Sequence, residues 1–448
     1  MAFVLRMIRT VFYKLAVTGI TFLSSVLITR YLPVSSRGVY TETTTALLLF
    51  SSFLAGYSNF FNYGINRLKY DRQDVFSVLL RQYALICVGI VLMLIASLIG
   101  IQFNSFFIYT ALLMVTLPFT LFLAFATKFV NALNQIDLLN RLNMLQSVMM
   151  FFFVILLFCT SKWHFFGSKF PLLPFTFTGW TLSYVLAAAI AMVFALRVGQ
   201  VRIRPRKDQE IGKKLGDYGH KISMQSFLTL LNYRGDLYFV GLLAGSTLLA
   251  RQVSAGLYGI AVTASEILWQ VSQSVAVLVY SRVATEERNN STVLTERMFR
   301  YTFWLLVVLG IIMAILSPLI PIVFGARYHP SIAPFEVLLV GTAAYGAIGL
   351  LTQYFTDQLG KVKYPMIMQI VSIVVNASIC LLTIPHVGMI GGAIASSTAY
   401  LVALGMSVTY FRFHAKRPLH YLFLPTKQDA ELAVRIVSRF RRVNKASK

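Results

Sequence analysis

Apolar residues run almost without interruption through segments of about 20 residues, and these segments recur along the whole chain. A segment of this length crosses the hydrocarbon core of a membrane as one helix, whereas helices of soluble proteins interrupt their apolar face every few residues. The pattern predicts an all-α, polytopic membrane protein with about 12 transmembrane helices. The predicted spans are residues 11–31, 38–62, 77–101, 106–131, 143–161, 177–198, 222–244, 252–280, 300–324, 332–356, 365–385 and 390–413.

The composition agrees with this prediction, because 57% of the 448 residues are hydrophobic, 12% are charged and the mean hydropathy is +0.71. A soluble protein is usually about half apolar and about a quarter charged. The three cysteines, Cys87, Cys159 and Cys380, each lie inside an apolar segment. This placement favours small buried side chains over a disulfide framework or a zinc site.

The formal net charge of +24 could point to nucleic acid, anionic lipid or an anionic substrate, and the placement of the charges decides between them. With a cytoplasmic N-terminus, roughly 33 of the Lys and Arg residues fall on cytoplasmic segments and about 6 on outer loops, as the positive-inside rule expects. The charge is then mainly an orientation signal. Both termini are predicted to be cytoplasmic, and no nucleic-acid partner is expected.

The longest internal polar stretch separates two groups of six spans, which predicts four regions. They are an N-terminal six-helix lobe (1–198), a basic cytoplasmic linker (199–221), a C-terminal six-helix lobe (222–413) and a cytoplasmic tail (414–448). Within the tail, residues 429–443 have the pattern of a basic amphipathic helix, which would lie on an anionic membrane surface. A solvated helix or a disordered tail is the alternative.

The two halves carry similar patterns, which predicts an internal repeat. In the first and the seventh span, polar residues at steps of four, three and four keep to one helical face. A glycine-containing motif follows each stripe, at residues 37–40 and 255–258. Because each half has six spans, the repeat would be parallel, with its axis along the membrane normal; chance similarity of two apolar segments is the alternative. The stripes are Lys14, Thr18, Thr21 and Ser25 in the first half and Gln225, Thr229, Asn232 and Asp236 in the second.

Ionisable groups at membrane depth are the strongest functional candidates, because burying a charge in lipid is costly. They are Lys14, Arg234, Asp236 and Glu266. On a regular helix Arg234 lies about 200 degrees from Asp236, so both could face one lumen only if the helix broke at Gly235. A local Arg–Asp pair that neutralises both charges is the alternative. Glu266 could bind a coupling proton or sodium ion, contact substrate hydroxyls, or form only an interhelical hydrogen bond.

Polar faces on otherwise apolar helices must meet each other or line water, so a central polar cavity is expected. The sequence contains no Walker A loop and no HExxH motif, so neither ATP hydrolysis nor metal catalysis is expected. No cofactor is predicted, apart from a coupling H+ or Na+.

Several motifs together resemble a known family. They are residues 30–33 (RYLP), 37–40 (RGVY), 231–241 (LNYRGDLYFVG), 255–269 (AGLYGIAVTASEILW) and 388–395 (GMIGGAIA). In their order and spacing they are similar to polysaccharide and O-antigen flippases, the Wzx-type branch of the multidrug/oligosaccharidyl-lipid/polysaccharide (MOP) exporter superfamily. The resemblance extends through about residue 413. It implies two six-helix lobes around a central cavity, without the two extra spans of the lipid II flippases.

The resemblance implies a flippase, not an enzyme. Its substrate would be a polyprenyl-pyrophosphate-linked oligosaccharide, moved across the bacterial inner membrane by alternating access for surface polysaccharide biosynthesis. An ion gradient or the membrane potential would supply the energy. The implied partners are the lipid-linked substrate, membrane lipids and a polysaccharide polymerase.

For this cargo, Lys14 and Arg234 are expected to attract the pyrophosphate, and Asp236 or Glu266 to sense the coupling ion. The residues expected to bind the sugars are Asn232, Gln270, Gln353 and Asn376. A multidrug or cation antiporter of the same superfamily is one alternative, although its cationic substrates favour an acidic cavity. An integral-membrane glycan polymerase is another, although the longest outer loop, 162–176, contains no carboxylate.

Overall fold

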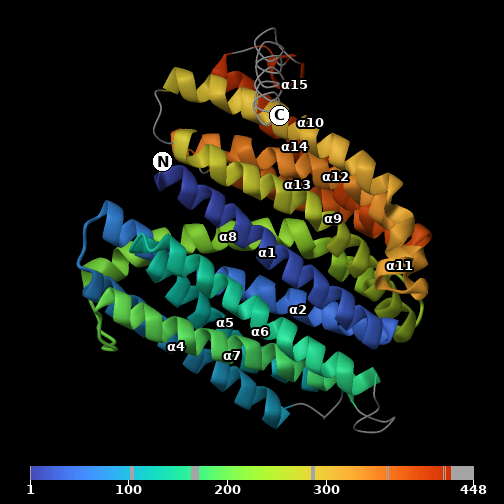
Figure 1. The fold of residues 1–448 in the computed structure, drawn as a ribbon, viewed down its shortest axis with the longest axis horizontal. Coiled ribbons are helices and arrows are strands. Elements are labelled where there is room, and N and C mark those ends of the chain that lie inside the picture. Colours follow the sequence, from blue (N-terminus) through green and yellow to red (C-terminus); the bar gives the residue numbers. More distant parts are fainter. Residues whose placement is uncertain are drawn as a thin grey trace, which may run out of the picture. The chain divides into compact units, whose positions relative to one another are not determined.

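The computed structural model of the chain describes residues 2–100, 105–162, 171–283, 288–359, 361, 363–416, 418 and 420–424 (Figure 1). None of these residues lies in a β-strand. The long helices are α1 (Ala2–Tyr31), α2 (Val34–Ala55), α4 (Arg72–Gly100), α5 (Ser105–Ala132), α6 (Ile136–Lys162), α7 (Leu172–Gly199), α8 (Gln209–Leu243), α9 (Leu248–Val283), α10 (Arg288–Ile315), α12 (Ile332–Gln353), α13 (Lys363–Val387) and α14 (Met389–Ala415).

Shorter helical turns follow several of the long helices. They are η1 (Gly56–Asn59), α3 (Phe60–Asn62), η2 (Tyr63–Arg67), η3 (Ser317–Leu319), α11 (Ile320–Phe324), η4 (Ala326–Ser331), η5 (Tyr354–Gln358) and α15 (His420–Phe423). Each predicted span overlaps one long helix, so the predicted all-α fold is confirmed.

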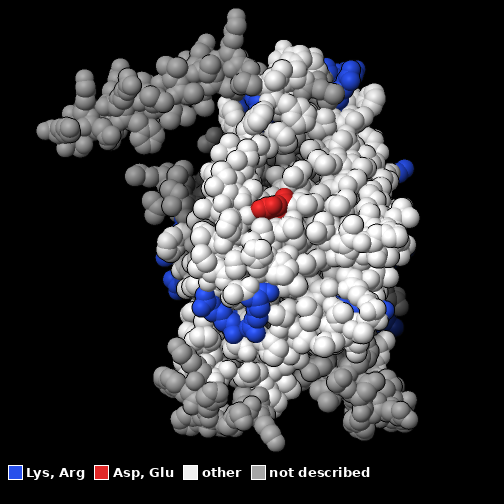
Figure 2. Space-filling view, turned by 90° about the vertical axis from the view of Figure 1, so that its right-hand side faces the viewer, with Lys and Arg blue, Asp and Glu red and all other residues white. Residues whose placement is uncertain are grey.

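The surface of the long helices is suited to lipid. Nine helical segments of the described residues are long and apolar enough to cross a membrane. On α4, for example, Leu85, Val88, Leu92 and Met93 are all exposed. Figure 2 shows one face of the molecule, on which Lys and Arg form a few groups and most of the described surface carries no charge. Because so many large apolar side chains face outward, we conclude that the chain is a multi-pass membrane protein.

The helices fall into two compact units. Unit 1 comprises Met1–Ala264, Leu316–Val337 and Ile373–Ser396; unit 2 comprises Ser265–Ile315, Leu338–Ser372 and Ser397–Lys448. The division into lobes 1–198 and 222–413 stays a prediction.

In unit 1, aromatic side chains fill the space between α3, α4 and α5. The ring of Phe125 lies 4.9 Å from Phe61, 5.1 Å from Phe76 and 5.2 Å from Tyr83, measured between centroids in near-perpendicular pairs. All four side chains are fully buried. Such edge-to-face pairs stabilise a core beyond the burial of their area alone.

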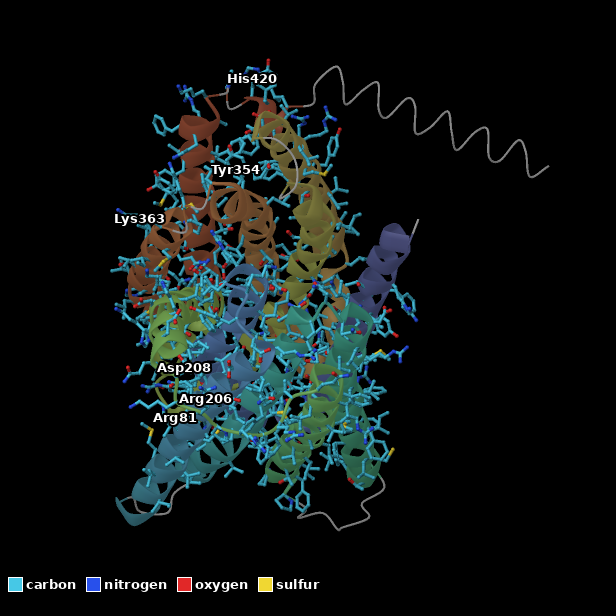
Figure 3. The ribbon with its side chains drawn as sticks, turned by 90° about the vertical axis from the view of Figure 1, so that its left-hand side faces the viewer. Arg81, Arg206, Asp208, Tyr354, Lys363 and His420 are labelled. Atoms are coloured by element: carbon cyan, nitrogen blue, oxygen red, sulfur yellow. The ribbon has the colours of Figure 1, made fainter. Side chains whose placement is uncertain are left out.

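The basic segment before α8 is held against the start of α4 in unit 1. Arg206 forms a 2.9 Å ion pair with Asp74, and its backbone N–H donates to the Ser77 carbonyl at 3.2 Å. Asp208 then caps α8 by accepting a hydrogen bond from the Ile211 N–H at 3.0 Å. Figure 3 labels Arg206 and Asp208 in this region. The cap explains why α8 begins at residue 209, well before the predicted apolar span at 222.

In unit 2, the short helix α15 packs on α10. The indole N–H of Trp304 donates to the Phe423 carbonyl at 2.7 Å, and the Arg300 guanidinium donates to the Tyr421 carbonyl. The rings of Phe303 and Phe423 meet edge to face, with centroids 5.2 Å apart. These contacts fix the first residues beyond the last span. The amphipathic segment predicted at 429–443 lies outside the described residues.

The two glycine-containing motifs of the predicted repeat contact each other within unit 1. A Cβ on Gly38 would meet the Gln252 carbonyl and lie 3.1 Å from the Gly256 nitrogen; a Cβ on Gly256 would meet the Val34 carbonyl and lie 3.1 Å from the Gly38 nitrogen. Each glycine therefore faces the carbonyl four residues before the other. Such reciprocity is the geometry of equivalent positions related by a two-fold axis, and it supports the predicted repeat.

Replacing Gly38 with alanine should destabilise the protein, because the new methyl group would force the backbones of α2 and α9 apart. Overpacking of this kind costs about 1–3 kcal/mol. The matched control is Gly19→Ala on α1, where the added Cβ would have no atom within 4 Å. Thermal unfolding of the purified variants should give a lower Tm for Gly38→Ala and an unchanged or higher Tm for Gly19→Ala. Equal Tm values would contradict the close approach.

Candidate functional site

A buried carboxylate lies at the centre of a polar cluster in unit 1. Asp236 on α8 is only 2% exposed. Its Oδ2 accepts hydrogen bonds from the Tyr258 hydroxyl of α9 and, at 2.6 Å, from the Ser396 hydroxyl of α14. Its Oδ1 accepts from the Leu237 N–H at 2.8 Å. These donors replace the water that the carboxylate would lose on burial, and they join three helices at one point.

Asn376 of α13 extends the cluster. Its side-chain amide donates to the Ser396 hydroxyl at 2.9 Å, and the Cys380 thiol donates to its carbonyl oxygen at 3.4 Å. Ser396 thus accepts from Asn376 and donates to Asp236. The structure therefore brings together two of the residues predicted to act in transport, Asp236 and Asn376, through a serine that the sequence did not single out.

Small residues on α14 make this meeting of helices possible. A Cβ on Gly392 would lie 2.6 Å from Val240 and 3.5 Å from the ring of Tyr258. A larger residue at position 392 would meet the Val240 side chain, so that side chain or α14 itself would have to shift. Close approach at small residues is common where membrane helices pack.

Helix α8 runs without interruption from Gln209 to Leu243, so the break considered at Gly235 is absent. Asp236 faces the protein interior, whereas Arg234 is half-buried, with its guanidinium 5.9 Å from the ring centroid of Tyr233. On an unbroken helix the two side chains point to different sides. Arg234 and Asp236 therefore do not line one lumen at this helix, because residues two apart on a regular helix point about 200 degrees from each other.

The other predicted site residues lie in several places. Asn232 is buried on α8, one turn before Asp236. Lys14 lies on α1 with an exposed side chain, and in unit 2 Glu266 and Gln270 lie one turn apart on α9, both half-buried. The side chain of Gln353 lies outside what the structure describes. The transport roles of these residues stay predictions.

A buried arginine near the start of α2 was not predicted as a site residue. Arg37 is 4% exposed, its Nη2 donates to the Ser25 hydroxyl at 3.0 Å, and its guanidinium lies 5.1 Å from the ring centroid of Tyr40. Its Nε has no hydrogen-bond partner, and no carboxylate of the described residues forms an ion pair with it. The predicted span began at residue 38 and left Arg37 in an outer loop, but the helix begins at Val34, directly after Pro33.

In each half, the last residue of the polar stripe is bound by a side chain of the glycine-containing motif that follows it. Ser25 ends the polar stripe of α1 and is bound by Arg37 of the motif 37–40. Asp236 ends the matching stripe of α8 and is bound by Tyr258 of the motif 255–258. The bonding side chains differ in place, since Arg37 is the first residue of its motif and Tyr258 the fourth of its own. The buried charge of the first half is therefore a cation in the motif, and that of the second half is an anion in the stripe.

Removing the acceptor of the cluster should destabilise unit 1. Asp236→Ala leaves the Tyr258 and Ser396 hydroxyls buried without their acceptor, at a cost of about 1–3 kcal/mol for each unsatisfied group. Thr263→Ala is the control, since that hydroxyl bonds the Gly259 carbonyl of its own helix at 2.8 Å. We expect a clear fall in Tm for Asp236→Ala and a small change for Thr263→Ala. An unchanged Tm in Asp236→Ala would mean that the cluster does not hold the helices together.

Comparison with known proteins identifies the fold of the chain. No protein-family model matches the sequence, and no curated protein matches it. Solved structures do match. An inward-facing multidrug resistance transporter of the MATE family is similar with a TM-score of 0.71 at 12% identity, covering 91% of this chain and 98% of that chain.

Two other structures are similar over nearly the whole chain. The lipid II flippase MurJ in an inward closed conformation has a TM-score of 0.67 at 15% identity, with 94% of this chain and 89% of that chain covered. A MOP superfamily transporter from Pyrococcus furiosus, in which a binding pocket of reverse polarity suggests a different function, has a TM-score of 0.63 at 12% identity, with 92% and 95% covered. The predicted two groups of six spans fit these transporters. The chain therefore has the fold of the transporters of the MOP superfamily.

Proposed function

We propose that the chain is a MOP superfamily flippase that moves a polyprenyl-pyrophosphate-linked oligosaccharide across the bacterial cytoplasmic membrane by alternating access. The observation that carries the proposal is the buried guanidinium of Arg37, which has no carboxylate partner among the described residues of a fold shared with transporters. Both termini would be cytoplasmic, and a polysaccharide polymerase would act on the product.

An anionic cargo would use the positive charges of α1, α2 and α8. Burying an unpaired guanidinium is costly, and the cost is recovered when an anion binds. Arginine presents a rigid fork of donors that matches phosphate oxygens. We assign Arg37 to the pyrophosphate together with Arg234 and Lys14. Arg37 retains free donor capacity, because only one of its nitrogens donates to Ser25.

The sugar portion requires groups that both donate and accept hydrogen bonds. Side-chain amides do this, and we assign Asn232, Gln270, Gln353 and Asn376 to the oligosaccharide. Asn376 already bonds Ser396 and Cys380, so sugar binding there would compete with contacts inside the cluster. Sugar binding would then change the hydrogen bond that Ser396 donates to Asp236.

Coupling to an ion would act through Asp236, with Glu266 as the second candidate. In the structure Asp236 accepts hydrogen bonds from Tyr258 and Ser396. Both hydroxyls bond Oδ2, so a proton on that oxygen would turn it into a donor, and at least one of the hydroxyls would have to turn away. Protonation would thereby loosen the junction of α8, α9 and α14.

Multidrug transport is a second candidate, favoured by two observations. Multidrug resistance transporters of the MATE family share the fold, and Asp236 is a buried carboxylate in unit 1. A cationic drug would need such an acidic group. Arg37 opposes this candidate, because a buried positive charge repels a cationic substrate.

Vesicle assays should separate the two candidates. In vesicles containing purified protein, the lipid-linked oligosaccharide extracted from cells that lack the protein should cross the bilayer. Arg37→Gln should slow this movement about 10- to 100-fold, the loss expected for one hydrogen bond to a charged group, and Arg234→Ala should slow it as well. Arg251→Gln is the matched control, since its Nε donates only to the Gly245 carbonyl, at 2.9 Å. Uptake of a cationic dye without movement of the lipid would favour the multidrug candidate.

The pH dependence of transport tests the ion-coupling role. If Asp236 carries the proton, wild-type transport should change with pH, and Asp236→Asn, which cannot ionise, should remove that change. Glu266→Gln should keep it. The reverse pattern would move the role to Glu266, and transport independent of pH in the wild-type protein would exclude proton coupling through either carboxylate.

A further inference from the structure

A cavity of about 590 Å³ lies in unit 1 where α1 and α6 end. It is lined by Arg30 and Tyr31 of α1, by Phe158 and Ser161 of α6, and by residues 324–327, which comprise the last residue of α11 and the turn after it. No acidic side chain is among these lining residues. The cavity is therefore a positively charged recess, and none of its lining residues has a role in the proposed transport function.

The two arginines are fixed by a reciprocal exchange of hydrogen bonds. Arg30 reaches from α1 to α11, where its Nε donates to the Val323 carbonyl at 2.9 Å and its Nη2 to the Ile322 carbonyl at 2.6 Å. Arg327 reaches back to α1, where its Nη2 donates to the Thr29 and Arg30 carbonyls at 2.7 and 3.1 Å. Arg30 thus caps the carbonyl end of α11, and Arg327, which follows α11 in η4, caps the carbonyl end of α1; such ends favour cations.

These contacts leave donors available at the cavity. Nη1 of Arg30 and both Nε and Nη1 of Arg327 have no hydrogen-bond partner among the described residues. Neither arginine forms an ion pair there. Two fixed positive charges beside one cavity repel each other, and an anion between them would remove that repulsion. Guanidinium groups held in place are suited to phosphate oxygens, because little side-chain entropy is lost on binding.

The size and the walls of the cavity indicate the kind of anion. Its volume is about twenty times the roughly 30 Å³ share of one water molecule, so it is much larger than a bare oxyanion requires. Aromatic rings of Phe158 and Phe324 form part of the wall, and Phe324 is held by an edge contact with Phe22 at 5.7 Å between centroids. Such a wall fits a phosphate ester with organic groups attached.

We propose that this cavity is a phosphate-binding site that takes the phosphate group of an anionic phospholipid headgroup or a free phosphate ion. It lies at the ends of two helices that are apolar enough to span a membrane, where lipid headgroups are found. Basic pockets between spanning helices bind anionic headgroups on the cytoplasmic side of membranes, and the same chemistry would hold a headgroup of the outer leaflet, where the predicted orientation puts this cavity. The proposal does not depend on the transported substrate.

Binding to the purified full-length protein in detergent tests the site, with separate arms for the two sources. Short-chain phosphatidylglycerol, short-chain phosphatidylcholine and inorganic phosphate are titrated separately at constant ionic strength, and calorimetry gives each Kd. We expect saturable binding of phosphatidylglycerol, at least tenfold tighter than phosphatidylcholine. Saturable binding of inorganic phosphate would identify the free ion as a sufficient ligand. No saturable binding of either phosphate source, or equal affinity for the two lipids, would overturn the proposal.

Variants show whether binding occurs at this cavity. The Arg30→Gln/Arg327→Gln double variant should bind at least tenfold more weakly, whereas Arg251→Gln, which removes one cation of unit 1 outside the cavity, should bind as the wild type does. Because the double variant also loses the contacts to helix ends, Ala326→Phe provides a second test. It fills the cavity and leaves both arginines in place, and it should weaken binding as well. Unchanged affinity in both cavity variants would contradict the assignment.

Discussion

A carboxylate buried among apolar helices must obtain hydrogen-bond donors from the protein, because lipid supplies none. Asp236 obtains them from Tyr258 and Ser396, and this need joins α8, α9 and α14 in one junction. Asn376 brings α13 to the same point through Ser396. Gly392 suits the same junction, since a Cβ there would lie 2.6 Å from the Val240 side chain.

The predicted repeat pairs polar positions of the two halves. Gly38 and Gly256 pack against each other reciprocally, and the motif around each one binds the last polar residue of the preceding stripe. The first half buries a cation, Arg37, in its motif, and the second half buries an anion, Asp236, at the end of its stripe.

The sequence predicted the helices well, since the length of each apolar segment is set by membrane thickness. It predicted their ends less well. Some helices begin with polar turns outside the membrane, such as the turn that Asp208 caps. These turns contain no apolar pattern from which the start of the helix could be predicted. Arg37 was missed for this reason, because its turn after Pro33 is polar although the structure buries the arginine.

Within the site, Asp236 and Asn376 could be predicted as functional residues because polar residues at membrane depth are rare. Their connection through Ser396 could not be predicted. Ser396 lies in a run of small residues, and nothing in its sequence environment marks it as the link. Such pairings depend on how α13 and α14 pack on α8, which local patterns do not encode.

The proposed export of a lipid-linked glycan is best tested on the lipids of a strain that lacks the protein. The lipid-linked intermediates are extracted, identified by mass spectrometry and assigned to a leaflet with a membrane-impermeant reagent. A polyprenyl-pyrophosphate-linked oligosaccharide should accumulate on the cytoplasmic side, with loss of the corresponding surface polysaccharide. Unchanged intermediates and surface glycan, together with new sensitivity to cationic drugs, would contradict the export of a lipid-linked glycan.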